Sequence, residues 1–290
     1  GDGTFTDVSE KSGTIGEPVH SSDMLFGDFD DDGDVDMVVL NPAGTSRFYD
    51  NRRQGIFSDI SDRAGLDFVG QPSSIVMGDY NNDGYLDIFI ADLSAEHHAI
   101  FKNKGDGTFI KDKKSLSGVF GLNGFSAIQA KFADLDNDGY LDILVAGSAA
   151  ESDKKKDGLI LLHNDGYGKY TDASATLPSG SSPIEHIYTI DLDNDGDLDI
   201  IQINDLGQLQ ALRNDGGNLN NYLKIRLTGL RTGSSKNNYF GIGSKLEVKS
   251  GGLYQMQSVN KPVSHFGLGK RDRADVVRVI WSNGVPQNRF

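Results

Sequence analysis

The sequence contains no cysteine among its 290 residues. A disulfide framework, a thiolate metal site and a thiol nucleophile are therefore all excluded. The sequence also lacks any apolar run of 18 or more residues, so no segment is predicted to span a membrane. No secretory signal peptide is visible. Because residue 1 already lies inside a repeat, we expect the N-terminus to be a cut or processed edge.

Basic charge is scarce: 28 Lys and Arg stand against 42 Asp and Glu, which gives a net charge of −14. Eighteen of the acidic residues fall in four windows, 28–36, 79–87, 134–142 and 191–199, leaving 28 basic against 24 acidic residues elsewhere. The acidity therefore belongs to four segments rather than to the whole surface. Carboxylates this concentrated need cations and repel phosphate, so nucleic acid is not expected as a partner.

The four windows align without gaps as copies of one motif, and their starts lie 51, 55 and 57 residues apart. Positions 1, 3 and 5 carry Asp or Asn, position 6 is always Gly, and position 9 is always Asp. The residues at positions 1, 3, 5, 7 and 9 are predicted to bind a metal: Asp28, Asp30, Asp32, Asp34, Asp36, Asp79, Asn81, Asp83, Tyr85, Asp87, Asp134, Asp136, Asp138, Tyr140, Asp142, Asp191, Asp193, Asp195, Asp197 and Asp199.

Short apolar segments rich in β-branched residues flank each window, which is typical of buried strands. They lie before the windows at 24–26, 75–77, 128–132 and 187–190, and directly after them at 37–40, 88–91, 143–146 and 200–203. A third segment follows and ends at Asn51, Asn103, Asn164 or Asn214, and a fourth strand then begins at Phe57, Phe109 or Tyr170. Four short strands per unit of roughly fifty residues predict an all-β protein built of propeller blades.

The windows have the chemistry of calcium loops. Calcium takes six to eight oxygen ligands, which positions 1, 3, 5 and 9 offer as side chains and position 7 as a backbone carbonyl. An EF-hand would need Glu at position 12 and helices on both sides, but Val39, Ile90, Val145 or Gln202 stands there and the flanks are strands. We therefore predict about four Ca²⁺, one per loop, with Mg²⁺ second. Neutral Asn81 makes the second loop the weakest predicted site.

These loops and the recurring turn of Asn, Gly and an aromatic residue, clearest over Asn103 to Phe109, resemble the FG-GAP/VCBS repeats of integrin-type β-propellers. The resemblance covers about residues 1–215 and implies calcium on the rim of the propeller. Family propellers usually have about seven blades, so the four loops imply part of a larger propeller. The alternative is a closed four-bladed ring, in which a strand at Phe5 completes the fourth blade.

The stretch after residue 217 breaks the repeat and predicts a small β-domain over 218–290, following blades over 1–217. Strands are expected at 222–227, 245–249, 254–259 and 276–281. Gly241-Ile-Gly243, His265-Phe-Gly-Leu-Gly269 and Trp281-Ser-Asn-Gly284 resemble the ASPIC/UnbV domain. Ser282 stands where that family usually has Pro, and the segment Ser258 to Pro262 also departs from the family pattern. We expect this domain to be incomplete at Phe290.

The remaining motifs indicate no catalysis. His97 and His98 are expected to be exposed loop residues rather than a metal site, and His265 a packed structural histidine rather than a base. There is no convincing set of nucleophile, base and orienting residue, so an enzyme is not expected.

The sequence therefore predicts an extracellular, secreted or cell-surface module, with the periplasm as a further option. It would be stabilised by calcium and would bind protein or glycan partners in adhesion. One alternative is a self-assembling structural subunit of a surface layer or filament. Another is a calcium-dependent carbohydrate-active lyase or hydrolase.

Overall fold

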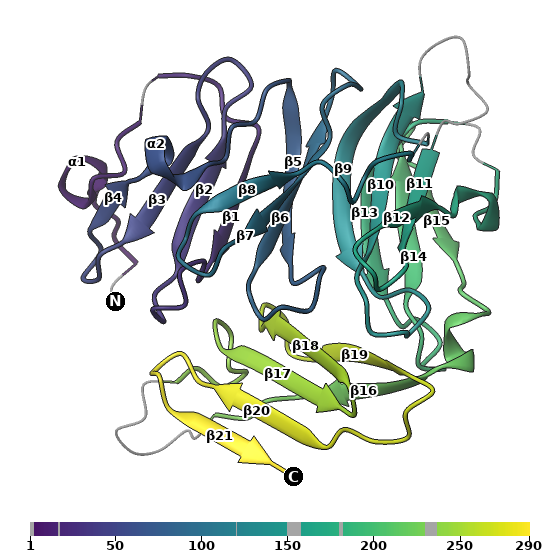
Figure 1. Ribbon diagram of the computed structural model, residues 1–290. Helices are drawn as coiled ribbons and strands as arrows, with labels where there is room; N and C mark the ends of the chain where they lie inside the picture. Colours follow the sequence, from purple (N-terminus) through teal and green to yellow (C-terminus); the bar gives the residue numbers. More distant parts are fainter. Residues whose placement is uncertain (1–2, 17, 120, 150–157, 180–181, 230–236) are drawn as a thin grey trace.

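The computed structural model describes residues 3–16, 18–119, 121–149, 158–179, 182–229 and 237–290. Within them the chain is almost entirely β, as predicted, and forms four blades followed by two further sheets (Figure 1). The helices of this part are single turns: α1 (Ser9–Ser12), α2 (Ser61–Ala64), η2 (Ser174–Thr176) and η3 (Gly217–Leu219). None of them is long and apolar enough to cross a membrane.

Each blade is an antiparallel sheet whose strands follow chain order. Blade one holds β1 (Asp23–Gly27), β2 (Asp36–Leu40), β3 (Arg47–Asn51) and β4 (Phe57–Asp59). Blade two holds β5 (Pro72–Gly78), β6 (Asp87–Asp92), β7 (Ala99–Asn103) and β8 (Phe109–Asp112). Blade three holds β9 (Phe125–Ala133), β10 (Asp142–Ala149), β11 (Gly158–Asn164) and β12 (Tyr170–Asp172). Blade four holds β13 (Ile184–Ile190), β14 (Asp199–Asn204) and β15 (Leu209–Leu212).

The apolar cores lie between neighbouring blades. Phe29, Phe48 and Phe109 meet between blades one and two, with ring centroids 5.6 to 5.9 Å apart. Strand β6 is buried at every position because blades cover both of its faces, whereas β2 alternates between buried and half-buried residues because blade one has a neighbour on one face. The continuous apolar run after each acidic window is therefore the strand that packs against adjacent blades.

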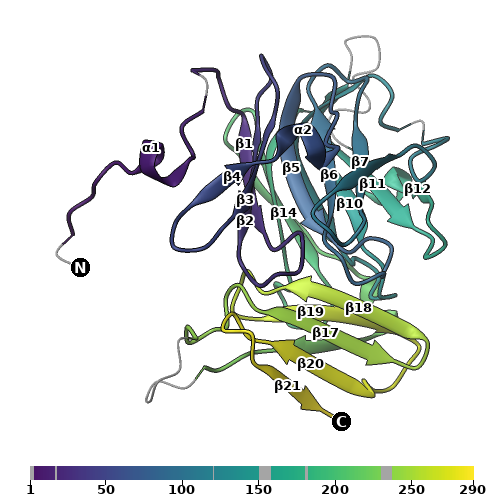
Figure 2. The same cartoon turned by 60° about the vertical axis from the view of Figure 1, so that its left-hand side comes forward.

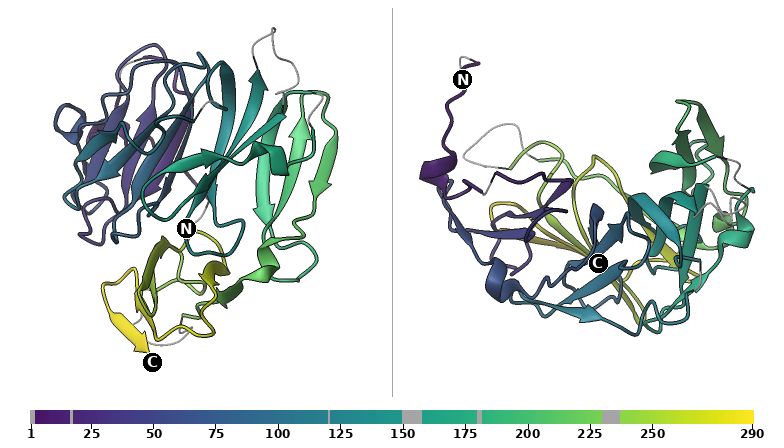
Figure 3. Two further views of the ribbon diagram at one scale, coloured as in Figure 1. Left: turned by 45° about the vertical axis from the view of Figure 1, so that its right-hand side comes forward. Right: turned by 90° about the horizontal axis from the view of Figure 1, so that it is seen from above.

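The blades form an open arc when seen from above (Figure 3). Phe5 is 99% exposed and pairs with no strand of blade four, and blade four has three strands in the described part of the chain. The alternative of a four-bladed ring closed by the Phe5 strand is therefore wrong for this structure.

One asparagine lies at the end of each third strand or, in blade four, two residues after it; we call Asn51, Asn103, Asn164 and Asn214 the turn asparagines. Asn103 Nδ2 donates to Phe29 O of the preceding blade at 2.8 Å and to Leu86 O of its own blade at 3.0 Å. The same pair of bonds recurs at Asn164 and at Asn214. Among the described residues, Asn51 Nδ2 makes only the bond within its own blade, to Val35 O.

The strands after residue 220 form two sheets that lie beneath the blades (Figures 1 and 2). One pairs β16 (Asn221–Ile225) with β19 (Ser264–Gly269). The other has the order β18-β17-β20-β21, with β17 (Lys245–Ser250), β18 (Leu253–Ser258), β20 (Val276–Ile280) and β21 (Pro286–Arg289). Strands β16, β17, β18 and β20 match the segments predicted from the sequence, while β19 and β21 were not predicted. We call the part of the chain from residue 221 onward the cap.

Candidate metal centres

The four acidic windows connect the first strand of each blade to the second; we call them acidic loops one to four. All four lie at the end of the blades that faces the cap (Figure 1). Gly at position 6 has φ between 87° and 103° in every loop, which a residue without Cβ adopts without strain. The glycine at position 6 therefore has a conformational role in this turn.

Position 4 also has a positive φ in every loop, between 56° and 63°. No role was predicted for this position from the sequence. Asp or Asn stands there each time, and these residues tolerate the left-handed region better than others. Asn82 Nδ2 donates to Gly139 O of the next loop, and Asn137 Nδ2 donates to Gly196 O of the loop after that. Position 4 therefore shapes its own loop, and in loops two and three it also contacts the next loop. The repeated Asx at this position was a usable sequence signal.

The carboxylate of position 1 accepts a hydrogen bond from the position 6 amide in all four loops, at 2.8 to 3.1 Å. This bond folds each loop back on itself. It also brings ligand atoms to within 4.8 Å of one another in one group per loop: Asp28, Asp30 and Asp32; Asp79, Asp83 and Asp87; Asp134, Asp136 and Asp138; Asp191, Asp193 and Asp199.

Position 9 is buried in all four loops and holds the blade together. One oxygen of Asp36, Asp87, Asp142 and Asp199 accepts the backbone N–H of the turn asparagine of its own blade, at 2.8 to 2.9 Å. Asp87 and Asp199 belong to their loop's ligand group, whereas Asp36 does not. Asp142 instead groups with Asp136 and His163.

Positions 5 and 7 differ among the loops. Asp195 lies outside the ligand group of loop four, since its carboxylate accepts from Asn218 Nδ2 at 2.7 Å. The carboxylate of Asp34 pairs with Arg53, and that of Asp197 accepts from Asn218 N. The rings of Tyr85 and Tyr140 lie against the turn glycines Gly105 and Gly166. The predicted ligand at position 7 is the backbone carbonyl. The side-chain contacts do not test it, so it stays a prediction.

Burial and mutual repulsion raise the carboxyl pKa values in the loops. The pKa rises to about 6 for Asp28, to about 7 for Asp36 and Asp79, and to about 9 for Asp87, with burial as the main cause in each case. Burial, reinforced by Asp142 and Asp138, also raises the pKa of Asp134 well above its usual value. Carboxylates in this situation favour a bound cation, which would offset both the burial and the repulsion.

In the described residues, four loop oxygens are buried without a hydrogen-bond partner: Asp28 Oδ1, Asn81 Oδ1, Asp191 Oδ1 and Asp197 Oδ1. An unpaired buried oxygen costs about 1–3 kcal/mol, and a cation at the centre of the loop would supply its missing partner. The donor set is made entirely of carboxylate, amide and carbonyl oxygens, which is the chemistry of a calcium site. The residues of the loops therefore fit the predicted ion.

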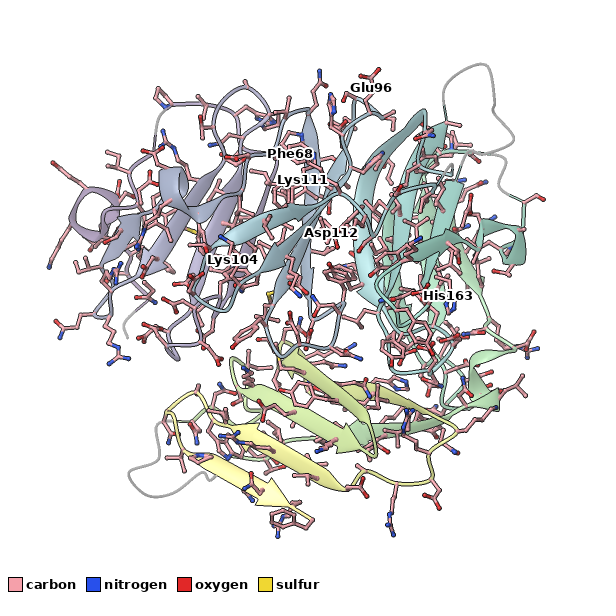
Figure 4. All side chains as sticks on the ribbon, in the orientation of Figure 1. Phe68, Glu96, Lys104, Lys111, Asp112 and His163 are labelled. Carbon is pink, nitrogen blue, oxygen red and sulfur yellow. The ribbon has the colours of Figure 1, made fainter. Side chains whose placement is uncertain are left out.

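In blades two and three the residue before the turn asparagine also reaches its acidic loop, and sequence reasoning missed it. Lys102 pairs with Asp83 at 2.9 Å, and His163 Nδ1 lies 3.1 Å from Asp142 Oδ1 at the loop-bearing end of its blade (Figure 4). The hydrogen bond to Asp142 raises the pKa of His163 to about 9. The signal was available in the sequence, because the position directly precedes a residue that the repeat identifies.

The expectation of an exposed His97–His98 pair is wrong for His98. Its Nδ1 accepts the amide of Asp92 at 3.2 Å, and its Nε2 lies 3.0 Å from Phe125 O. His265 is buried and stacks on Tyr222, as expected for a structural histidine.

Acid should destabilise the chain partly through His98. Burial lowers the pKa of His98 below 6.5, outweighing the opposing effect of Asp92. As the pH falls, the imidazole of His98 is protonated in the unfolded chain before it is protonated in the folded chain. The stability that depends on neutral His98 is therefore complete above about pH 6.5 and is lost as the pH falls below that value. In urea unfolding between pH 7.5 and 5.5, in saturating calcium, His98→Gln should lose less stability than the parent chain, by up to about 1.4 kcal/mol per pH unit. Equal losses would contradict this assignment.

Comparisons with known proteins agree with the architecture. The model of the FG-GAP-like repeat matches residues 28–90, 80–145 and 134–202, and that of the ASPIC and UnbV domain matches 233–289. Cartilage acidic protein 1 from Homo sapiens is 27% identical over 267 residues, and that from Xenopus tropicalis 25% over 263. These alignments cover 88% and 86% of this chain and 40% of each relative, so the chain spans about two fifths of their length.

A solved structure of a lectin from Agrocybe aegerita, described as recognising non-reducing terminal N-acetylglucosamine, is 21% identical with a TM-score of 0.38. The match covers 67% of this chain and 53% of the lectin, and so low a score carries no argument about the ligand. The matches to the FG-GAP-like repeat model run through all four acidic loops and do identify the family. This chain belongs to the family of FG-GAP-like repeat proteins, with an ASPIC/UnbV domain after the repeats.

Proposed function

We propose that this chain is a calcium-stabilised propeller module that acts outside the cell, binding protein or glycan partners in adhesion. The observation that supports it best is the gathering of ligand oxygens within 4.8 Å in each of four acidic loops at one end of the blades. Buried oxygens without partners in three of the loops point to the same ion. Calcium at millimolar concentration outside cells fills even weak sites, whereas cytosolic calcium does not.

The role we propose is binding rather than catalysis. The carboxylates that could act as acids or bases are held inside the acidic loops, where they would be ligands of the ion. Loops carried on a rigid scaffold are where binding residues concentrate, and the blades provide such a scaffold. A glycan array and a protein-capture screen, each run with calcium and with chelator, would test this role. Cleavage of a polysaccharide by the purified chain would contradict it.

A specific observation also favours self-assembly as a second candidate. Met24 and Phe26 on β1 are about half exposed, on the face of blade one that has no neighbouring blade. Tyr188 and Ile190 on β13 are exposed in the same way at the other end of the arc. Apolar faces of this kind suit contact with another copy or another propeller segment. Light scattering across a concentration series would reveal such assembly, and a constant monomer mass would rule it out.

Isothermal titration of metal-free protein tests the calcium sites directly. We expect about four sites, with loop two filling last because Asn81 replaces a carboxylate at position 3. Asn81→Asp should raise the affinity of that site on the order of tenfold, since affinity follows the number of charged ligands.

The matched control for Asn81→Asp is Asp136→Asn, the reverse exchange at the same position of loop three, which should lower the affinity of that loop. If loop two fills first in the parent chain, the ranking is wrong. If no calcium binds, the proposed function fails.

A further inference from the structure

The cap lies on the end of the blades that carries the acidic loops, and it contacts all four of them (Figures 1 and 2). Each loop has its own contact from the cap. The pairs, in the order of the loops, are Lys245 with Asp31, Tyr254 with Gly84, Gly267 with Asp134, and Lys224 with Asp191. The contacts to loops one, two and four are made by side chains of the cap. The contact to Asp134 of loop three is made by the backbone of the cap.

The backbone contact comes from β19, which carries the motif His265-Phe-Gly-Leu-Gly269. The amide of Gly267 donates to Asp134 Oδ2 at 3.1 Å, and the amide of Gly269 donates to Asn137 O at 2.7 Å. Asp134 is position 1 of loop three, and its Oδ2 also accepts the amide of Gly139. The cap therefore hydrogen-bonds to a carboxylate that belongs to the ligand group of this loop.

His265 adds a third bond between β19 and loop three. Its Nε2 lies 2.6 Å from Asn137 Oδ1. Because Asn137 Nδ2 donates to Gly196 O and Gly217 O, Oδ1 is the acceptor and the histidine donates. Tyr222 stacks on the imidazole with centroids 5.6 Å apart, which fixes the orientation of the ring.

The fit at this contact leaves no room for a side chain at Gly267. A Cβ there would lie 2.1 Å from Asp134 Oδ2 and 2.4 Å from the carbonyl carbon of Asn137. Glycine within a strand often marks a close approach of another backbone, and this is the case here. The requirement for glycine at this position thus comes from the acidic loop and not from the cap's own sheet.

We propose that the cap is a calcium-dependent lid whose docking is coupled to the occupancy of loop three through the bond from Gly267 to Asp134. This inference rests on the proposed calcium binding. Donors that hold a metal ligand in place typically contribute 10–100-fold to metal affinity. Linkage makes the coupling reciprocal, so an ion in loop three strengthens the docking of the cap by the same factor. Without the ion, repulsion among the loop carboxylates opposes the geometry that β19 requires.

The test uses the whole chain and two glycine variants of the cap. Gly267→Ala introduces the clash with Asp134. Gly252→Ala is the matched control, because a Cβ there has no atom within 4 Å. Calorimetric calcium titration gives the affinity of each class of site, and amide hydrogen exchange of residues 264–269, with calcium and with chelator, reports docking. Circular dichroism confirms that each variant is folded.

We expect Gly267→Ala to weaken one site 10–100-fold, to affect the other three far less, and to abolish the calcium-dependent protection of β19. Gly252→Ala should behave as the parent chain. Four sites of parental affinity in Gly267→Ala, or equal protection of β19 with and without calcium in the parent chain, would overturn the coupling and leave the proposed calcium binding intact. A parent chain that binds no calcium would overturn both.

If Gly267→Ala does not fold, His265→Phe provides the same test without a backbone clash. Phenylalanine keeps an aromatic ring against Tyr222 and removes the bond to Asn137. We expect it to weaken the same single site and to increase exchange of β19 in calcium. Parental affinity and parental exchange in this variant would overturn the coupling.

Discussion

Removing calcium with a chelator should lower the unfolding temperature of the chain by about 20 °C or more. An ion present at 100 times its dissociation constant stabilises the folded state by about 2.7 kcal/mol per site, and four such sites would contribute about 11 kcal/mol. Net stabilities of domains are about 5–15 kcal/mol, so the loss is of the same size as the whole. For a domain of this size each kcal/mol shifts the unfolding temperature by roughly 2–4 °C.

Differential scanning calorimetry with calcium, with chelator, and with calcium restored after chelation measures this effect. Magnesium at equal concentration is the first control, and it should restore the unfolding temperature only in part, because it prefers fewer protein ligands and retained waters. Sodium chloride at equal ionic strength is the second control and tests simple screening of the carboxylates. An unfolding temperature that is unchanged by the chelator would contradict the structural role of the ion.

Replacing a turn asparagine that bridges two blades should cost far more stability than replacing the one that does not. Asn103→Ala removes the bonds to Phe29 O, Leu86 O and the amide of Gly105, and Asn103 is 1% exposed. Buried groups left without a partner cost about 1–3 kcal/mol each, so we expect a loss of about 3 kcal/mol or more. Asn164→Ala should behave in the same way, because its Nδ2 bridges to Tyr80 O.

Asn51→Ala is the matched control. Asn51 ends the third strand of blade one, as Asn103 ends the third strand of blade two. Its Nδ2 donates to Val35 O within its own blade but makes no bond to another blade in the described residues. It is also half-buried rather than buried, so we expect a loss of about 1 kcal/mol. Urea unfolding of the three variants in saturating calcium gives the comparison. Equal losses in all three would show that the bridge between blades adds nothing.

The repeat made the blades predictable, because a short apolar strand directly follows each acidic loop and the loops recur at a nearly constant spacing. Segment 88–91, for example, became β6, extended by one residue at each end. Strand β19 was missed for a physical reason. Its motif is rich in glycine and lacks the alternation that marks a half-buried strand, since its sequence is set by close approach to loop three.

The candidate sites were predictable in part. Positions 1 and 6 of the loops have local roles, which are visible in the spacing of Asp and Gly alone. The bridges from Asn103 to Phe29 and from Asn82 to Gly139 join residues of different blades, so they depend on how the blades stack. No single repeat contains that information.

The hydrogen bonds between blades also have a consistent direction along the chain. Three turn asparagines, Asn103, Asn164 and Asn214, each donate to the position 2 carbonyl of the acidic loop in the preceding blade. The position 4 asparagines Asn82 and Asn137 each donate to the position 6 carbonyl of the acidic loop in the following blade. Every loop is thus held by its nearest neighbours, as in a one-dimensional lattice of interacting sites. An ion that orders one loop would prepare the adjoining loops, and the four sites would fill more steeply than four independent ones.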